Sequence, residues 1–171
     1  MDMSAITQRM EANTNVISSL ASGVSGEQAR WKPNAESWSL LEVICHLYDE
    51  EREDFRTRVD LTLHQPDTPW PPIDPQGWVT SRGYNGRNLA TKLQAWLEER
   101  AKSLAWLRGL SNPDWSISRP RPRGGTIRAG DVMASWLAHD HLHIRQLNNL
   151  HYLWHKQQSA PFDVGYAGEW E

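Results

Sequence analysis

The sequence predicts an all-α protein, folded as an up-down four-helix bundle with long loops between helices 2 and 3 and between helices 3 and 4. Two observations support this fold class. Four segments carry apolar residues at helical spacing, and no segment of any length alternates apolar and polar residues as a strand would. The chain has 171 residues, so we expect a single domain over residues 1–171 with a core of its own.

The first two helices are expected over residues 4–22 and from Ser39 to about Leu63. Gly23 and Gly26 follow the first, and Ser39 with Glu42 has the spacing of a capping box at the start of the second. The charged tract 49–54 continues the second helix. The apolar faces consist, in the first helix, of Ile6, Met10, Ile17 and Leu20, and in the second of Leu40, Val43, Ile44 and Leu47.

The third and fourth helices are expected over residues 88–110 and 128–156. Residues 64–87 and 111–125 are rich in Pro, Gly and charged residues and are expected to be loops, and the tail 159–171 shows no helical pattern. Loops of this length in a small domain are often lids or walls of functional sites.

The composition narrows the range of functions. The chain has 18 basic and 21 acidic residues, which does not suit a generic nucleic-acid binder. The single cysteine, Cys45, cannot form an intrachain disulfide. We find no run as apolar and long as a membrane span and no signal-peptide pattern at the N-terminus. We therefore expect a cytoplasmic protein that acts on a small molecule, without nucleic-acid or membrane partners.

Two of the seven histidines lie in the middle of the apolar face of the fourth helix. Successive helical residues turn by about 100°, so relative to His139 the positions of His143 and the apolar residues fall between roughly 20° and 80°. Two inward imidazoles one turn apart need polar partners, and a metal ion such as zinc, nickel, iron or copper would supply one. The apolar residues of this face are Val132, Trp136, Leu147, Leu150 and Trp154.

His46 on the second helix provides a third ligand facing the pair. Three protein ligands with an open position are typical of a catalytic metal. Cys45 points about 100° away from His46 and is interpreted as a packed residue. The remaining histidines are weaker candidates: His141 is expected on the polar side, His151 and His155 on the shoulder of the apolar face, and His64 in or beside a loop.

Two other metal motifs fit poorly. A di-iron bundle needs two Glu-x-x-His pairs, and the only approach to one here is Asp140-His141-Leu142-His143. The zincin motif His-Glu-x-x-His would require a glutamate where Asp140 stands.

Two segments resemble the DinB/YfiT-like superfamily: Trp38-Ser39-Leu40-Leu41-Glu42-Val43-Ile44-Cys45-His46-Leu47 and His139-Asp140-His141-Leu142-His143-Ile144-Arg145-Gln146-Leu147. The tail 164–170 is also similar to that of some members. The sequence departs from the commoner pattern at Leu142, where many members have histidine, and at Ile144 and Arg145. The resemblance covers most of the chain.

This resemblance implies a four-helix bundle, often a homodimer, that binds one divalent metal ion through His46, His139 and His143. Nickel or zinc is expected first, with iron or manganese as further options. Characterised members of the superfamily imply chemistry with low-molecular-weight thiols such as bacillithiol, mycothiol or glutathione. A metal with an open position favours the thiolate and so produces a nucleophile.

Three functional hypotheses follow. The first is a metal-dependent thiol S-transferase, with Glu50 as a fourth ligand or proton acceptor. Arg119, Arg121 and Arg123 would bind a carboxylate or the thiol, and the pocket walls would include Trp70, Trp78 and Trp170. The second is a metal-dependent hydrolase using Glu50 or Asp140. The third is a non-catalytic stress-related protein whose metal stabilises the fold. For each arginine and for Glu50, a solvated side chain is the competing interpretation.

Overall fold

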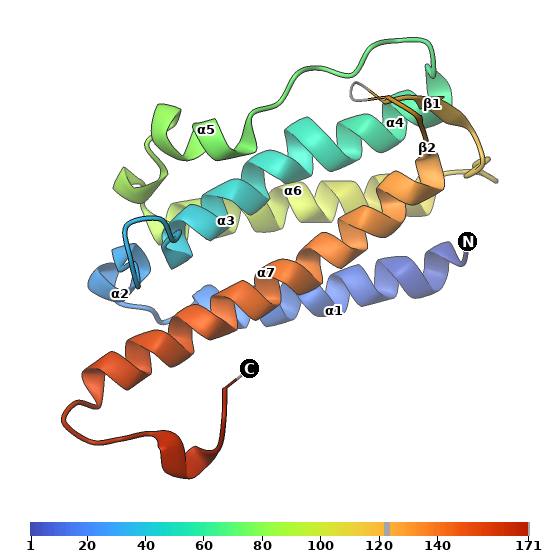
Figure 1. The fold of residues 1–171 in the computed structure, drawn as a ribbon. Coiled ribbons are helices and arrows are strands. Elements are labelled where there is room, and N and C mark those ends of the chain that lie inside the picture. Colours follow the sequence, from blue (N-terminus) through green and yellow to red (C-terminus); the bar gives the residue numbers. More distant parts are fainter. Residues whose placement is uncertain (122–123, 171) are drawn as a thin grey trace.

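The structure is a computed structural model, and it describes residues 1–121 and 124–170. Four long helical rods pack into a bundle (Figure 1), which confirms the all-helical four-helix bundle predicted from the sequence. One rod is composite, because an α-helix, a π-helical segment and a second α-helix follow one another without a break. The rods are α1 (Met3–Ala21), α3 (Leu40–Asp49) with η1 (Glu50–Phe55) and α4 (Arg56–His64), α6 (Leu89–Gly109) and α7 (Ala129–Gln158).

The rods do not alternate strictly in direction, as an up-down bundle would, because the second and third rods along the chain run in the same direction. Asn13 contacts Asp140 and Leu20 contacts His151, so α1 and α7 run in the same direction. The rod α3–η1–α4 and helix α6 also run in one direction, opposite to the first pair (Figure 1). The connection 65–88 makes this possible, because it carries the chain back along the bundle before α6 begins.

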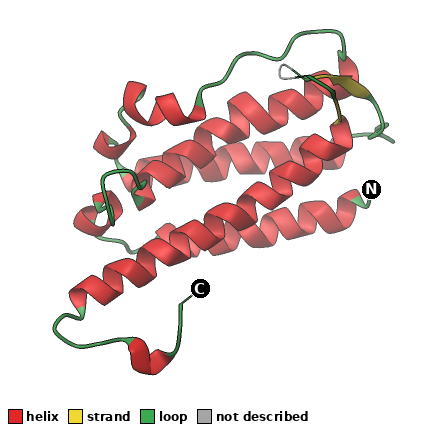
Figure 2. Cartoon of the chain, in the orientation of Figure 1, coloured by secondary structure: helices red, strands yellow, loops and turns green. Residues whose placement is uncertain are grey.

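Short elements occupy regions that the sequence predicted as loops or as an irregular tail (Figure 2). Helix α5 begins where Asp74 caps Gly77 and Pro75 occupies the first helical position. The strands form a hairpin in which Arg119 pairs with Ile127. These elements are too short for apolar periodicity to reveal them. They are α2 (Gly26–Arg30), α5 (Pro75–Ser81), η2 (Tyr84–Gly86), β1 (Ser118–Pro120), β2 (Thr126–Arg128) and η3 (Gly165–Ala167).

The capping box predicted at the start of the second rod is present. The Ser39 side chain accepts a hydrogen bond from the Glu42 backbone N–H at 3.2 Å, and the Ser39 N–H donates to Glu42 Oε2 at 2.8 Å. Two backbone donors at the helix end are thereby satisfied. The cap fixes where α3 begins, and so the height at which His46 projects into the bundle.

The middle of the second rod is π-helical rather than the regular α-helix that the periodicity predicts. A π-helical turn is wider than an α-helical turn and is often found at functional sites. Here it directs acidic side chains into the bundle: Glu50, Glu51 and Asp54 are all buried. The last residue of the segment, Phe55, stacks on Trp136 of α7.

A buried ion cluster links three of the four rods. The guanidinium of Arg100 on α6 is 1% exposed and donates to both carboxylate oxygens of Glu51 and both of Asp140, at 2.8–2.9 Å. Trp136 Nε1 adds a bond to Glu51 Oε2 at 3.2 Å. The cluster therefore fixes the position of η1, which directly follows the helix of His46, relative to α7, which carries His139 and His143. Within residues 1–121 and 124–170, no helix has the length and apolarity to cross a membrane.

Candidate metal centre

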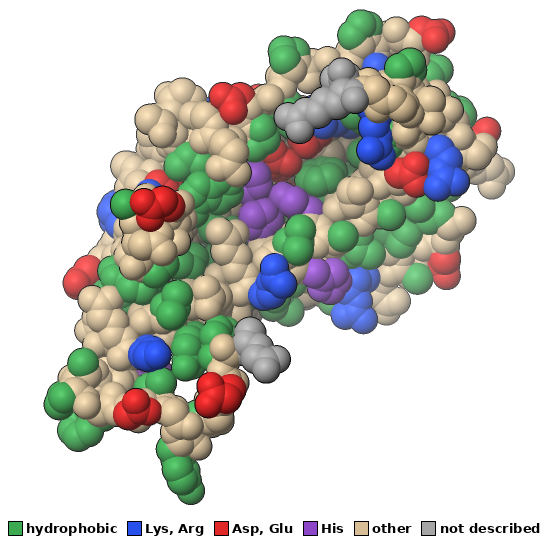
Figure 3. Space-filling view, in the orientation of Figure 1, with side chains coloured by type: hydrophobic (Ala, Val, Ile, Leu, Met, Phe, Trp, Pro, Cys, Tyr) green, Lys and Arg blue, Asp and Glu red, His purple; other side chains and the backbone are tan. Residues whose placement is uncertain are grey.

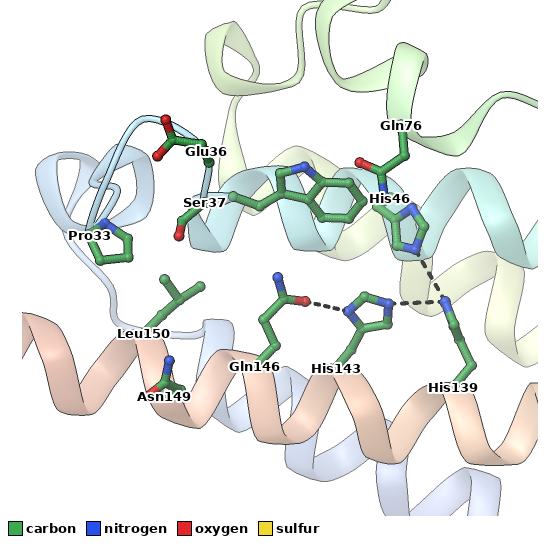
Figure 4. Close-up of a pocket in the computed structure, with 11 residues that line it drawn as sticks. Pro33, Glu36, Ser37, His46, Gln76, His139, His143, Gln146, Asn149 and Leu150 are labelled. Atoms are coloured by element: carbon green, nitrogen blue, oxygen red, sulfur yellow. Dashed lines mark hydrogen bonds between the residues drawn. The ribbon is translucent and has the colours of Figure 1, made fainter. Parts of the chain in front are cut away.

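Three imidazole rings converge between the second rod and α7. His46 projects from α3, and His139 and His143 project one turn apart from α7 (Figure 4). His139 Nε2 lies 3.2 Å from His46 Nε2 and 3.0 Å from His143 Nε2. One nitrogen from each ring lies within 4.8 Å of the other two. The structure thus brings together the three residues that the helical spacing and the resemblance selected.

All three imidazoles are held in the neutral form. Burial lowers the pKa of His46 to about 3 and that of His139 to about 2, and each is lowered further by the neighbouring His143. The pKa of His143 is also lowered by burial, partly opposed by its hydrogen bond to Gln146. Neutral imidazole is the form that binds metal ions, because a ring nitrogen must offer its lone pair.

Gln146 sets the tautomer of His143. The His143 Nδ1–H donates to Gln146 Oε1 at 2.8 Å, so Nε2 carries no hydrogen and points at the other two rings. Such an outer partner orients a histidine ligand and raises its basicity. Sequence reasoning did not select Gln146, although it follows His143 by three residues on the same helix and so lies beside it.

The donor set fits a divalent ion. An ion bound at about 2.1 Å by two nitrogens separates them by about 3.0 Å at a right angle and about 3.4 Å at a tetrahedral angle. The distances from His139 Nε2 to His143 Nε2 and to His46 Nε2, 3.0 and 3.2 Å, fall within this range. Hydrogen bonding among the three Nε2 atoms is a poorer alternative, because His139 Nε2 carries at most one hydrogen and has two Nε2 neighbours, at 3.0 and 3.2 Å.

The histidines form one wall of an open pocket of about 560 Å³. On the face shown in Figure 3, histidine side chains lie at the floor of a hollow. Trp38 packs against His46 with ring centroids 4.8 Å apart, and Gln76 of α5 and Gln146 of α7 add polar groups. The loop 33–37 closes the far end (Figure 4). Trp38 and Gln76 were missed from sequence, because a loop residue and a short helix carry no periodic signal.

Glu50 is buried but does not line this pocket. Its carboxyl oxygen Oε1 has no hydrogen-bond partner within the described residues. Burial, and then the adjacent carboxyl of Asp54, raise the pKa of Glu50 to about 8. This raised pKa favours the protonated carboxyl of Glu50, which lies in η1 one turn after His46. The potential metal-ligand atoms that lie within 4.8 Å of one another belong to the three histidines, and the carboxyl oxygens of Glu50 are not among them.

Three other candidates from the sequence, Asp140, Arg119 and Arg121, lie away from the metal pocket. Asp140 is 0% exposed and both its oxygens accept from Arg100, so it is committed to the ion cluster and is not available as a base. Arg119 and Arg121 line a different pocket, beside the hairpin. Arg123 lies outside the described residues.

The remaining histidines have ordinary partners or are exposed. His151 donates from Nε2 to the Leu20 carbonyl at 2.6 Å and accepts from Gln28 at Nδ1, which accounts for both ring nitrogens. His64 pairs with Asp60, and His155 contacts Ser159. His141 is exposed, as its position on the polar side of the helix predicted. Cys45 is buried, in accord with its interpretation as a packed residue.

The three tryptophans expected to wall the metal pocket do not line it. Trp78 lies under the guanidinium of Arg82, and Trp70 lines the pocket beside the hairpin. Trp170 of the tail donates to Asn149 Oδ1 at 2.9 Å. It lines a neighbouring hollow that shares Gln146 and Asn149 with the metal pocket.

Comparison with known families decides the classification. The profile of the DinB superfamily matches residues 9–147, which include all three histidines. The chain belongs to the DinB superfamily. No curated protein sequence matches it.

Solved structures share this fold at low sequence identity. YfiT from Bacillus subtilis is described as "a probable metal-dependent hydrolase with an unusual four-helix bundle topology". It is 18% identical with a TM-score of 0.77, over 86% of this chain and 85% of that chain. The mycothiol-dependent maleylpyruvate isomerase is 16% identical with a TM-score of 0.68, and a histidine-to-alanine variant of it is 14% identical with a TM-score of 0.69. Both matches span 86% of this chain but 61% of the isomerase chain.

Proposed function

We propose that this DinB-superfamily protein is a metal-dependent enzyme that holds one divalent ion through His46, His139 and His143. The observation that carries the proposal is the convergence of three neutral imidazoles on the wall of an open pocket, with His139 Nε2 at 3.0 and 3.2 Å from Nε2 of His143 and His46. A purely structural site would be closed by a fourth protein ligand. Nickel and zinc suit an imidazole set of this kind, and iron is also compatible.

We further propose that the activity is transfer of a low-molecular-weight thiol to an electrophile. A divalent ion held there would supply Lewis-acid chemistry that favours the thiolate over the thiol near neutral pH. In the transfer, a sulfur–carbon bond forms as the bond from carbon to the leaving group breaks, and the thiol proton passes to solvent. The similarity in fold to a mycothiol-dependent isomerase supports a thiol substrate.

The chain's own residues have defined roles in this proposal. Gln146 keeps the His143 lone pair directed into the pocket. Trp38 covers one side of His46 and limits the access of water to it. The pocket, of about 560 Å³, is within the size range of small-molecule sites and leaves room for a thiol beside the histidines.

Turnover of defined thiols tests the proposal. Metal-loaded protein without an affinity tag is incubated with bacillithiol, mycothiol or glutathione and an alkyl halide, and thiol loss and thioether formation are measured. We expect one thiol to be consumed, with activity lost in His46→Ala and kept in His141→Ala, which alters an exposed histidine of α7. If metal-loaded protein neither binds nor consumes any of the three thiols, the transferase proposal is wrong.

Metal-dependent hydrolysis is the second candidate, favoured by the description of YfiT. Here the same ion would activate water, and Glu50, which is buried one turn after His46 but does not line the pocket, would have to exchange the proton indirectly. A fall in the hydrolysis rate of Glu50→Gln with the metal retained would favour this route. An unchanged rate would remove Glu50 from the mechanism.

Homodimer formation and a purely structural metal are separate proposals. Light scattering of the purified protein tests the dimer. A structural role predicts a sharp fall in melting temperature for His46→Ala together with no turnover of any thiol or ester. The open pocket beside the histidines argues for the catalytic alternative.

A further inference from the structure

A second pocket, of about 450 Å³, lies beside the hairpin β1–β2. Its walls come from the segment that follows α4 and from β1, and it shares no lining residue with the metal pocket. The hairpin ends where α7 begins (Figure 1), ten residues and therefore about 15 Å of helix before His139. The pocket is lined by Asp67, Trp70, Arg119 and Arg121, with Pro66, Pro69 and Pro120 as apolar walls.

Unpaired hydrogen-bond donors are concentrated at this pocket. Arg119 is 6% exposed, and its Nη2 donates to the Thr68 carbonyl at 2.6 Å. Its Nε and Nη1 are buried and find no acceptor within the described part of the chain, and the same holds for Nε1 of Trp70. Buried donors are nearly always paired, so an unpaired group indicates an acceptor, such as water or a ligand, that residues 1–121 and 124–170 do not supply.

The positive charge at the pocket is only partly compensated. The guanidinium carbons of Arg58 and Arg119 lie 4.6 and 4.7 Å from the ring centroid of Trp70. Arg58 forms an ion pair with Asp54 at 2.7 Å, whereas Arg119 forms none with any described residue. Asp67 lines the pocket without pairing with Arg119, and the exposed Arg121 adds a further positive charge.

We propose that this pocket binds a small organic oxyanion, a carboxylate or phosphate ester carried on a flat apolar group. An oxyanion supplies only acceptors, which is what the unpaired donors of Arg119 and Trp70 require, and bonds to a charged donor are the stronger kind. The walls formed by Pro66, Pro69 and Pro120 give an apolar surface suited to the body of such a ligand. The site is independent of the metal ion.

Isothermal titration of the metal-loaded full chain with four probes tests the ligand class. We expect benzoate or phenyl phosphate to bind saturably at one site, and acetate and inorganic phosphate to bind at least tenfold more weakly. The two aromatic probes distinguish a carboxylate ligand from a phosphate ester. The absence of saturable binding by both aromatic probes would overturn the proposal, and equal affinity for the small anions would overturn the apolar part of it.

Variants of Arg119 and Trp70 test whether the anion binds in this pocket. Arg119→Lys keeps the charge but loses the planar donor set, and we expect it to weaken binding at least tenfold. Trp70→Phe keeps an aromatic ring and removes one donor, and we expect it to weaken binding of the aromatic anion about threefold. If Arg119→Lys fails to fold, the affinity of Trp70→Phe tests the site instead. Arg108→Gln, an exposed arginine paired with Glu11, is the matched control.

Two further results would contradict the proposal. One is unchanged affinity in both pocket variants. The other is loss of binding in a folded His46→Ala variant, which would place the anion at the metal pocket instead. Because His46→Ala should bind benzoate normally while losing metal, failure of this proposal and failure of the metal site give different results.

Discussion

At the scale of single residues, the tautomer of each histidine controls whether three imidazoles can share one ion. Only His143 has a described partner that fixes its tautomer, namely Gln146 at 2.8 Å. Nδ1 of His46 is buried and has no partner within the described residues. Metal affinity should therefore depend on Gln146 more than on any other pocket residue that does not bind the ion.

Replacing Gln146 by alanine should lower metal affinity by about 10- to 100-fold, because the His143 ring loses its fixed tautomer and orientation. Competition with a metallochromic chelator measures the change. Asn149→Ala is the matched control, since Asn149 lines the same pocket on the same helix but contacts Trp170 instead of a histidine. Equal affinity of the two variants would show that Gln146 does not position His143.

Glu50 should make stability depend on pH. Its pKa in the folded protein is raised above the unfolded value of 4.5, so folding favours the protonated form, and the contribution of Glu50 to stability falls as pH rises from about 4.5 to about 8. The three histidines, whose pKa values are lowered, contribute the opposite slope below about pH 6.5. Glu50→Gln should remove the contribution of Glu50, which is up to about 1.4 kcal/mol per pH unit. Urea unfolding of metal-free protein between pH 5 and 9 measures it.

The exposed carboxylate of Glu98 provides the control for this measurement. Glu98→Gln should leave the slope of stability against pH unchanged. If wild-type protein and Glu50→Gln have the same slope, Glu50 is ionised in the folded protein and its burial does not raise its pKa.

At the scale of elements, the π-helical segment η1 and helix α7 hold the histidines in register through Arg100 of α6. Glu51 and Asp140 together surround this guanidinium, and all three side chains are almost fully buried. Removing one member of a buried ion cluster leaves the others uncompensated in a medium of low dielectric constant.

Arg100→Met should destabilise the protein by about 3–5 kcal/mol, because Glu51 and Asp140 would remain as buried, unpaired carboxylates. Urea denaturation measures the loss. The exposed pair of Arg108 and Glu11 offers a contrast, since Arg108→Met should cost less than about 1 kcal/mol. Similar losses for the two variants would mean that the cluster is solvated.

Element boundaries were predictable where apolar periodicity or a cap marks them. The four rods and the capping box at Ser39 follow from the sequence, whereas η1 does not. A π-helical turn shifts the inward face by about one residue and leaves no repeat behind, so the burial of Glu50 and Asp54 could not be read from spacing. The hairpin and α5 were missed because each is only a few residues long.

At the scale of the whole molecule, the metal site exists only when the bundle is assembled. His46 lies far from His139 and His143 in sequence and comes from a different rod, so the unfolded chain presents no such site. The spacing on one helix predicted the pair, the position of His46 on the second helix predicted the third ligand, and the resemblance in two segments implied the same three residues. Which pockets the loop residues line depends on the path of residues 65–88, which the sequence does not specify.

Metal binding should stabilise the folded protein as a whole. A ligand at 100 times its dissociation constant adds about 2.7 kcal/mol to the free energy of unfolding. Adding zinc or nickel to metal-free protein should raise the melting temperature of the wild type but not that of His139→Ala. An equal rise in both proteins would mean that the metal binds elsewhere.

The metal content of the protein tests the account most directly. Elemental analysis is performed on protein purified without an affinity tag under metal-replete conditions, for the wild type, for His46→Ala, His139→Ala and His143→Ala, and for His141→Ala. We expect about one divalent ion per chain in the wild type and in His141→Ala, and a large loss in the other three. A wild type without stoichiometric metal, or full occupancy in the folded His46→Ala variant, would contradict the three-histidine site.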